Sequence, residues 1–283
     1  MLHDHVHPHF NNAYISAVPR DDSPVLLFHG EAVAMEEGLQ RFPRIDTLPD
    51  KHQPLQYLFS LEGNAYFLSS GQKLPPGCCW VPLREVRFNA SKGNAFVAGI
   101  GHQLSMWYLR HQFCGACGQA TQHASAERML FCPACGQVYY PTLNPAVIVG
   151  IINGNKLLVT RIKGRPSHHQ ALVAGYAEAG ETLEETVRRE VWEETGLKVT
   201  DITYYKSQPW GFSSSLLVGY YARLEGSDII NPQDEELESA SWVDRDALTL
   251  PFDGISLTNE MITRFALKGS EGLLRPQTPP FTE

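Results

Sequence analysis

The sequence predicts an α/β (α+β) chain in which strands surround one acidic helix, preceded by a zinc module and a small α+β N-terminal domain. Two observations support this prediction. Short apolar runs separated by turn residues lie on both sides of a helical pattern at 182–196. Directly before these runs stand two C-x2-C pairs, at 114–117 and 132–135.

The first part of the chain predicts a small α+β domain over residues 1–110. Residues 25–35 and 57–68 each read as a hairpin around a glycine. Residues 95–110 carry apolar side chains at helical spacing, which predicts a helix that leads into the first cysteine pair.

Four cysteines predict a zinc ribbon over residues 111–141. The pairs are separated by 14 residues, and a glycine follows the second cysteine of each, as suits the tight turn of a zinc knuckle. Two disulfides or a redox pair are the alternatives, but neither explains both knuckles. The four thiolates leave no open position on the metal, so we expect a structural Zn²⁺ held by Cys114, Cys117, Cys132 and Cys135.

The strands and the last helix predict a second domain over residues 142–270, followed by a tail at 271–283. Asn153-Gly154 lies between two apolar runs and predicts a hairpin turn. Leu257, Met261 and Phe265 form the apolar stripe of a C-terminal helix. The predicted strands are 146–152, 156–162, 171–175, 197–208, 215–224 and the start of 240–248.

The central helix carries both its own boundaries and a chemical face. Thr182 and Glu185 form a capping box, and Gly196 is a stop signal. Three glutamates at i, i+3 and i+4 share one face, where their mutual repulsion calls for cations. Hard oxygen ligands suit Mg²⁺ or Mn²⁺, which can clamp a pyrophosphate and activate water. The glutamates are Glu190, Glu193 and Glu194, and Arg189 is placed to hold a carboxylate; the alternative is a solvated acidic face.

Composition limits the class of protein. The 283 residues are 43% hydrophobic and carry a net charge of −8, which argues against a protein that mainly coats nucleic acid. No apolar run is long enough for a membrane span, and the first ten residues do not resemble a secretory signal. We therefore expect a cytoplasmic protein with no membrane contact.

Residues 175–197, GYAEAGETLEETVRREVWEETGL, match the pattern G-x5-E-x7-R-E-U-x-E-E-x-G-U at every fixed position, where U is a bulky apolar residue. The segment strongly resembles the Nudix hydrolases. This resemblance implies a Nudix fold, a mixed sheet sandwiched between helices. It also implies metal-dependent cleavage of nucleoside diphosphates linked to another group.

A second motif narrows the resemblance. Residues 207–215 read SQPWGFSSS, and the NADH pyrophosphatases carry SQPWPFPxS at this place. The four-cysteine module before the Nudix domain is similar to that family as well. Gly211 and Ser213 replace two prolines, so we expect a less rigid turn and a changed pocket.

The resemblance implies roles for individual residues. Arg189, Glu190, Glu193 and Glu194 correspond to the catalytic set, and the three glutamates to metal ligands. Glu236 resembles a further metal ligand, with Glu235 as its rival. The substrate contacts implied are Tyr140, Tyr176, Gln208, Trp210, Phe212 and Ser215, although Trp210 could instead fill a core. Relatives are homodimers, so we expect a homodimer here.

The leading hypothesis is hydrolysis of NADH or NAD⁺ to AMP and nicotinamide mononucleotide, with removal of NAD caps from RNA as an additional activity. The first alternative keeps the chemistry and changes the substrate to ADP-ribose or a dinucleoside polyphosphate. The second is a nucleotide- or RNA-binding protein without catalysis, which we would expect to have lost the glutamates of the motif.

Overall fold

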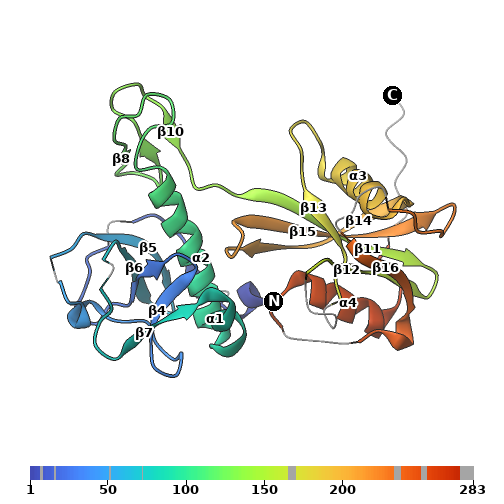
Figure 1. The fold of residues 1–283 in the computed structure, drawn as a ribbon, viewed down its shortest axis with the longest axis horizontal. Coiled ribbons are helices and arrows are strands. Elements are labelled where there is room, and N and C mark those ends of the chain that lie inside the picture. Colours follow the sequence, from blue (N-terminus) through green and yellow to red (C-terminus); the bar gives the residue numbers. More distant parts are fainter. Residues whose placement is uncertain are drawn as a thin grey trace. The chain divides into compact units, whose positions relative to one another are not determined.

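The computed structural model divides the chain into two compact units (Figure 1). The C-terminal unit consists of Met1, Asn144–Pro209 and Ser215–Glu283, and the N-terminal unit consists of Leu2–Leu143 and Trp210–Ser214. The cysteine module is not divided from the rest of its unit, so the predicted bounds of the four segments stay a prediction. The structure describes residues 1–6, 9–15, 17–50, 52–71, 73–164, 170–232, 237–249 and 254–274.

Before the cysteine module, the described residues of the N-terminal unit form two small sheets and two helices, as expected of an α+β domain. One sheet has the order β1-β5-β6-β2 and the other β3-β4-β7. The strands are β1 (Phe10–Asn11), β2 (Val25–Leu26), β3 (Phe28–His29), β4 (Ala32–Glu36), β5 (Leu55–Leu61), β6 (Asn64–Ser69) and β7 (Cys78–Pro82). The helices are α1 (Leu83–Asn89) and α2 (Lys92–Arg110), with short 3₁₀ turns at Leu2–His5 and Ile45–Thr47.

Both predicted hairpins of this unit are confirmed. Strands β3 and β4 pair around Gly30, whose φ is 57°, and β5 and β6 pair around Glu62 and Gly63, with φ of 51° and 79°. A positive φ at both central residues, as at Glu62 and Gly63, is one geometry of the tight hairpin turns that match strand twist. A glycine with positive φ at the first central residue, as at Gly30, is the other. Three two-residue strands complete the cysteine module: β8 (Gln122–His123), β9 (Leu130–Phe131) and β10 (Val138–Tyr139).

The C-terminal unit is built on one mixed sheet with the order β14-β15-β11-β12-β16, and β13 pairs with β11 beside this path. Strand β11 is parallel to β15 and antiparallel to β12 and β13. The strands are β11 (Asn144–Asn153), β12 (Lys156–Ile162), β13 (Val173–Tyr176), β14 (Lys198–Trp210), β15 (Ser215–Glu225) and β16 (Leu237–Asp244). A 3₁₀ turn follows at Arg245–Ala247.

The predicted hairpin between β11 and β12 is present, one residue further along than the motif suggests. Asn153 still pairs with Lys156, so the two loop residues are Gly154 and Asn155. Gly154 supplies the positive φ, 58°.

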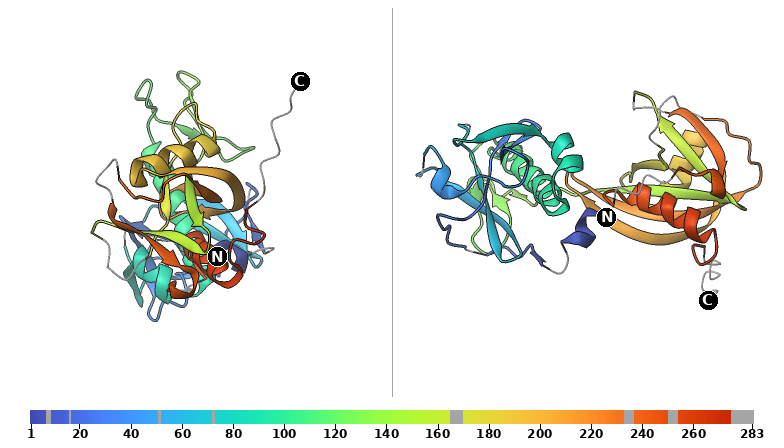
Figure 2. Two further views of the ribbon diagram at one scale, coloured as in Figure 1. Left: turned by 90° about the vertical axis from the view of Figure 1, so that its right-hand side faces the viewer. Right: turned by 90° about the horizontal axis from the view of Figure 1, so that it is seen from below.

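Both faces of the sheet are buried, which confirms the sandwich. Along β11, Val147, Val149 and Ile151 belong to the core that includes Val187 and Val191 of α3 (Leu183–Thr195). The alternate residues Ile148 and Ile152 belong to the core that includes α4 (Leu257–Lys268). Alternating strand residues point to opposite faces, so α3 and α4 cover opposite sides of the sheet (Figures 1 and 2).

The C-terminal helix forms as its apolar stripe predicts. Leu257, Met261 and Phe265 are fully buried. The Ser256 hydroxyl accepts a hydrogen bond from the Asn259 amide and so caps the first turn. Among the described residues, the helices fall short of the length and apolar character needed to cross a membrane.

Candidate active site and zinc site

Helix α3 begins and ends where the sequence predicts. The Thr182 hydroxyl accepts from the Glu185 amide at 3.2 Å, and the Glu185 carboxylate accepts from the Thr182 amide at 2.7 Å. Gly196 ends the helix in the left-handed conformation, with φ 69°. Val187 and Val191 are fully buried against the sheet. This anchoring fixes which face of α3 carries the glutamates.

Arg189 organises that face. Its Nε and Nη2 donate to the two carboxylate oxygens of Glu181 at 2.6 and 3.0 Å, a bidentate pair. Its Nη1 donates to Glu190 at 2.8 Å and to Glu193 at 3.0 Å. Its Nη2 also donates to the Tyr176 carbonyl at 2.8 Å, which ties the helix to the end of β13.

The pKa shifts follow from this network. The Arg189 guanidinium holds the pKa of the Glu181 carboxyl at about 2, well below its ordinary value, and the Glu178 amide adds to the effect. The pKa of Arg189 is raised in turn, chiefly by Glu181. Glu181 is therefore ionised at neutral pH and orients Arg189.

Gly175 leaves room for the Glu190 carboxylate. A Cβ at position 175 would lie 2.0 Å from the carboxyl carbon of Glu190. The role of the motif's first glycine is therefore to leave space for this side chain beside the β13 backbone, since the φ of Gly175 is not in the positive range.

The three glutamates differ in exposure. Glu194 is buried at 4% exposure, and its Oε1 accepts from the Ala174 amide at 3.4 Å. The side chains of Glu190 and Glu193 are 13% and 45% exposed. In the described part of the chain, the cysteines form the one group of three or more such ligands within 4.8 Å. Glu190, Glu193 and Glu194 share one face of α3, and the Arg189 guanidinium donates hydrogen bonds to Glu190 and Glu193.

Glu235 and Glu236 lie outside the described residues, so the fourth metal ligand stays a prediction.

Tyr176 and Ser215 meet beside this face. Their hydroxyls are 3.1 Å apart, the Tyr176 ring is 52% exposed, and Ser215 is buried. Tyr176 is on β13 and Ser215 is on β15, and both strands pair with β11. Ala146 of β11 pairs with Tyr176, and Asn144 of β11 pairs with Ser215. The sheet register therefore brings together two residues that are 39 positions apart in sequence.

Gln208 is fully buried, and both ends of its amide are used inside the protein. Its Nε2 donates to the Ile255 carbonyl at 2.7 Å, and its Oε1 accepts from the Leu257 amide at 2.7 Å. These bonds hold the start of α4 against β14. A role of Gln208 in substrate binding stays a prediction, and its present contacts are structural.

Trp210 and Phe212 belong to the N-terminal unit, where they flank one arginine. Their ring centroids are 5.2 Å apart. The Arg87 guanidinium of α1 lies 4.4 Å from the Trp210 centroid and 5.8 Å from that of Phe212, within the range of cation–π attraction. Nothing in the sequence alone pointed to Arg87.

Gly211 packs backbone to backbone against α2. A Cβ at Gly211 would lie 2.4 Å from the carbonyl carbon and oxygen of Gly99, and a Cβ at Gly99 would lie 3.2 Å from the Phe212 ring. The glycine that replaces the family's proline therefore permits a close contact. The expected loosening of the turn stays a prediction.

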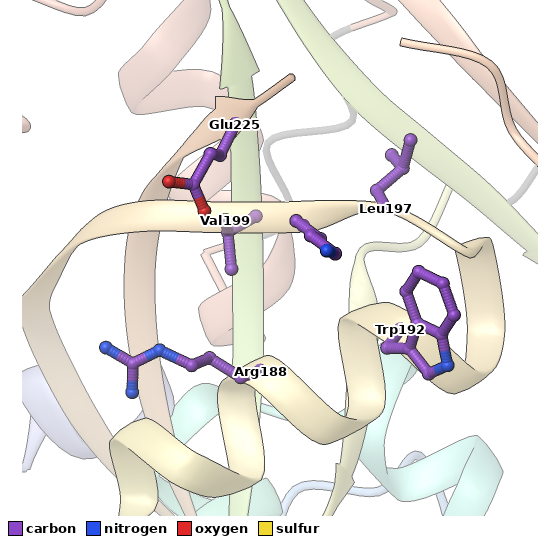
Figure 3. Close-up of a pocket in the computed structure, with 6 residues that line it drawn as sticks. Arg188, Trp192, Leu197, Val199 and Glu225 are labelled. Carbon is purple, nitrogen blue, oxygen red and sulfur yellow. The ribbon is translucent and has the colours of Figure 1, made fainter. Parts of the chain in front are cut away.

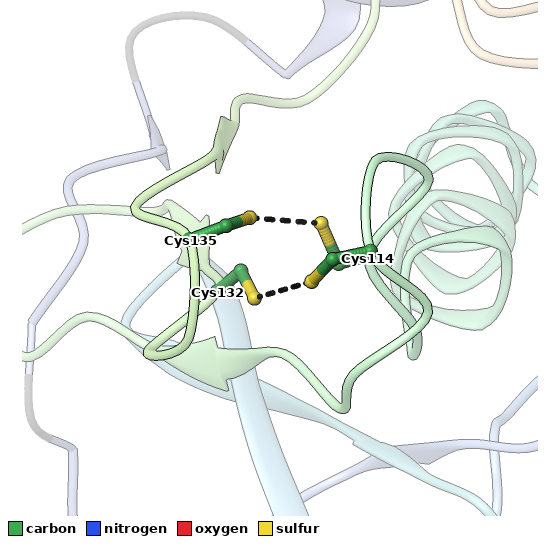
Figure 4. Close-up of side chains that lie close together, drawn as sticks. Cys114, Cys132 and Cys135 are labelled. Carbon is green, nitrogen blue, oxygen red and sulfur yellow. Dashed lines mark hydrogen bonds between the residues drawn. The ribbon is translucent and has the colours of Figure 1, made fainter.

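The four cysteine sulfurs form a compact cluster (Figure 4). Cys114 and Cys135 sulfurs are 3.6 Å apart, and those of Cys117 and Cys132 are 3.5 Å apart. Tetrahedral zinc with bonds of about 2.3 Å requires sulfurs about 3.8 Å apart, which these distances approach. Gly118 and Gly136 supply matching positive φ values, 75° and 78°, at the two knuckles.

Tyr139 supports one of these thiols. Its hydroxyl donates to the Cys114 sulfur at 3.3 Å and accepts from the Gly115 amide at 2.8 Å. This hydrogen bond is the largest cause that lowers the pKa of Cys114 to about 6, which favours the thiolate that a metal binds. The neighbouring Tyr140 is 53% exposed and donates to Glu127 at 3.3 Å.

Comparison with known proteins agrees with these two sites. The NUDIX domain family matches residues 142–265, and the NADH pyrophosphatase zinc ribbon domain matches residues 109–140. The chain is 39% identical over 184 residues to the NAD-capped RNA hydrolase NudC of Chromobacterium violaceum, covering 65% of this chain and 69% of that protein.

A protein of the same name from Pseudomonas aeruginosa strain PAO1 is 37% identical over 173 residues, covering 61% of this chain and 62% of the relative. This match spans less than two thirds of the relative's length. A solved NUDIX hydrolase from Nitrosomonas europaea is similar with a TM-score of 0.49 and 20% identity, covering 59% of this chain and 96% of that one.

Proposed function

Because the chain belongs to the Nudix hydrolases that carry an NADH pyrophosphatase zinc ribbon, we propose that it hydrolyses the pyrophosphate of NADH or NAD⁺. An NAD cap on RNA contains the same pyrophosphate, which joins nicotinamide mononucleotide to the 5′ end of the RNA, so removal of that cap is part of the proposal. The observation that carries it is the glutamate face of α3, organised around Arg189 by the Glu181 pair.

In the proposed reaction, the chain's own residues bind the metal and fix its position. Glu190, Glu193 and Glu194 offer carboxylate oxygens, the ligands that Mg²⁺ and Mn²⁺ prefer. The bound ion supplies charge stabilisation at the pyrophosphate and a more acidic water. Arg189 holds Glu190 and Glu193 at fixed positions through Nη1. One glutamate, Glu193 or Glu194, accepts the proton of the attacking water.

Water attacks one phosphorus of the pyrophosphate, and the bridging oxygen leaves with the other phosphate. The products are AMP and nicotinamide mononucleotide, reduced when NADH is the substrate. Each product carries one phosphate, so atoms and charge balance without a redox partner.

The proposed substrate contacts divide into two groups. Tyr176 presents a half-exposed ring whose hydroxyl is fixed by Ser215, which suits stacking on a base. Tyr140 is similarly exposed. Gln208, Trp210 and Phe212 have their main contacts inside the protein, and we propose that they position the neighbouring strand ends.

We further propose that Zn²⁺ occupies the four-cysteine cluster as a structural ion and that the protein is a homodimer. The sulfur spacing and the paired knuckles support the zinc. The dimer rests on the family resemblance.

A second candidate substrate class follows from the turn at 210–214. Gly211 and Ser213 stand where the NADH pyrophosphatases have prolines, and Gly211 is packed against Gly99. A turn with this different backbone can favour ADP-ribose or a dinucleoside polyphosphate with the same chemistry.

A substrate panel separates these candidates. Purified protein is incubated with Mg²⁺ or Mn²⁺ and NADH, NAD⁺, ADP-ribose or diadenosine tetraphosphate, and the products are separated by chromatography. We expect cleavage of NADH to AMP and reduced nicotinamide mononucleotide, with the highest kcat/KM of the four substrates. A higher kcat/KM for ADP-ribose or diadenosine tetraphosphate than for NADH would show that the second substrate class is the correct one.

A further inference from the structure

A further pocket lies between α3 and the start of β14 (Figure 3). Its volume is about 260 Å³, and Leu197 and Val199, both buried, line it as apolar residues. Arg188 and Trp192 of α3 line it from one side, and Glu225, at the end of β15, also contributes to the lining (Figure 3). Lys198, the first residue of β14, completes the lining.

This pocket is distinct from the glutamate face. Arg188 and Trp192 stand at i and i+4 and therefore share one side of the helix. Glu190 lies two residues from Arg188, roughly 200° around the helix axis. A ligand in the pocket thus contacts the side of α3 turned away from Glu190.

Trp192 provides an aromatic platform. The indole is 46% exposed, although the same helix buries Val187 and Val191 completely. The Nudix pattern leaves position 192 free, so the motif does not require a tryptophan there. An exposed indole beside an apolar floor suits stacking of a planar base.

The charge of the pocket suits a phosphodiester. Neither Arg188 nor Lys198 forms an ion pair with a carboxylate among the described residues, and Arg188 donates a hydrogen bond to the Glu184 carbonyl at 3.2 Å. With Glu225 the three charged side chains sum to one positive charge, in a chain of net charge −8. A phosphodiester carries one negative charge, whereas a free monophosphate carries nearly two at neutral pH.

Glu225 adds a hydrogen-bond acceptor that a bare anion could not use. A base amino group or a ribose hydroxyl can donate to it. The aromatic platform, the two cations and the hydrogen-bond acceptor together match the base, the phosphodiester and the polar groups of one nucleotide within a chain.

We propose that the Arg188–Trp192–Lys198 pocket binds one nucleotide of single-stranded RNA, the base on Trp192 and its phosphodiester between the two cations. The proposal rests on the proposed function, because NAD-capped RNA brings such a chain to the enzyme. It also gives an acidic protein a local positive contact for RNA.

The first test measures binding without catalysis. A fluorescein-labelled, uncapped single-stranded RNA is titrated with the full-length protein in the absence of divalent metal, and anisotropy is recorded. Trp192→Ala is expected to weaken binding at least about fivefold, the lower end of base-stacking effects. Leu267→Ala, another exposed apolar side chain on a helix of the same unit, is the matched control and should bind as the wild type does.

The second measurement tests the cations. Replacing both Arg188 and Lys198 by Gln is expected to reduce the slope of log affinity against log salt by about 0.7, the value for one phosphate contact in a single strand. Unchanged binding in Trp192→Ala, or an unchanged slope in the double variant, overturns the proposal. Competition by AMP at the same affinity as RNA also overturns it, in favour of a free-nucleotide site.

A kinetic comparison keeps this inference separate from the proposed function. Trp192→Ala should raise KM for NAD-capped RNA while leaving kcat/KM for NADH unchanged. Equal losses on both substrates would mean that the pocket acts through the fold, which contradicts the proposal. If the wild type cleaves neither substrate, the proposed function is wrong. The anisotropy measurement still shows whether the pocket binds RNA.

Discussion

Arg189 contacts three carboxylates and one backbone carbonyl, so its loss affects several groups at once. Arg189→Ala leaves Glu190 and Glu193 without the donor that fixes them. Removing a partner of metal-binding residues typically costs about 10–100-fold in activity or metal affinity. We expect a fall of that size in kcat for NADH at saturating metal.

Arg264→Ala is the control for that experiment, because Arg264 is an exposed arginine on α4. It should retain the activity of the wild type. Equal kcat in Arg189→Ala and Arg264→Ala would contradict a positioning role for Arg189.

Glu181 predicts a pH dependence of stability. Its pKa is about 2 in the folded protein, against an ordinary value of 4.5. Because the folded value is the lower one, the ionised carboxylate contributes stability above about pH 4.5 and loses it as the pH falls toward 2.

Glu181→Gln removes that contribution. The difference in free energy of unfolding between wild type and variant should therefore be full near pH 6 and shrink as the pH falls below about 4. Urea unfolding of both proteins at several pH values measures it. A difference that stays constant over this range would show that the Glu181 charge does not stabilise the fold.

At the scale of elements, the contact between the 210–214 turn and α2 is the feature most sensitive to a small change. Gly211→Ala places a methyl group 2.4 Å from the Gly99 backbone, where no side chain can move aside. Overpacking of this kind costs about 1–3 kcal/mol. We expect Gly211→Ala to unfold at a lower urea concentration than the wild type, with an unchanged dependence of the free energy of unfolding on urea concentration.

Ser213→Ala in the same turn is the matched comparison, since Ser213 is exposed. It should change stability by less than about 0.5 kcal/mol. If Gly211→Ala is as stable as Ser213→Ala, the close packing of Gly211 on Gly99 is not a constraint.

Helix α3 illustrates which features of the site can be predicted from the sequence. Helix α3 was predicted with its cap, stop and buried stripe because those signals are local and lie within fifteen residues. The glutamate face follows from helical spacing. The Glu181–Arg189 pair does not, since it needs the loop before α3 to fold back on the helix.

Long-range packing explains what the sequence could not predict. Trp210 and Phe212 lie against Arg87, more than a hundred residues earlier in the chain, and no periodic pattern links them. Gln208 has the polarity of a ligand contact, yet its amide bonds are satisfied by the start of α4. The close approach of Gly211 to Gly99 is likewise absent from any sequence pattern, because the two residues are far apart along the chain.

For the whole molecule, the cysteine cluster predicts a stoichiometric metal. Elemental analysis of protein purified without added metal should give about one zinc per chain, and Cys132→Ser should lose it. Chelation should lower the thermal stability of the wild type, because a structural zinc contributes folding energy. Retention of full stability after complete removal of zinc would contradict a structural role.

The central claim is that the glutamate face of α3 catalyses metal-dependent hydrolysis. Turnover of NADH by Glu190→Gln and Glu194→Gln, with folding checked by circular dichroism, tests it most directly. We expect folded variants whose turnover is abolished or reduced by orders of magnitude at saturating Mg²⁺ or Mn²⁺. Two folded variants that turn over NADH as fast as the wild type would contradict it.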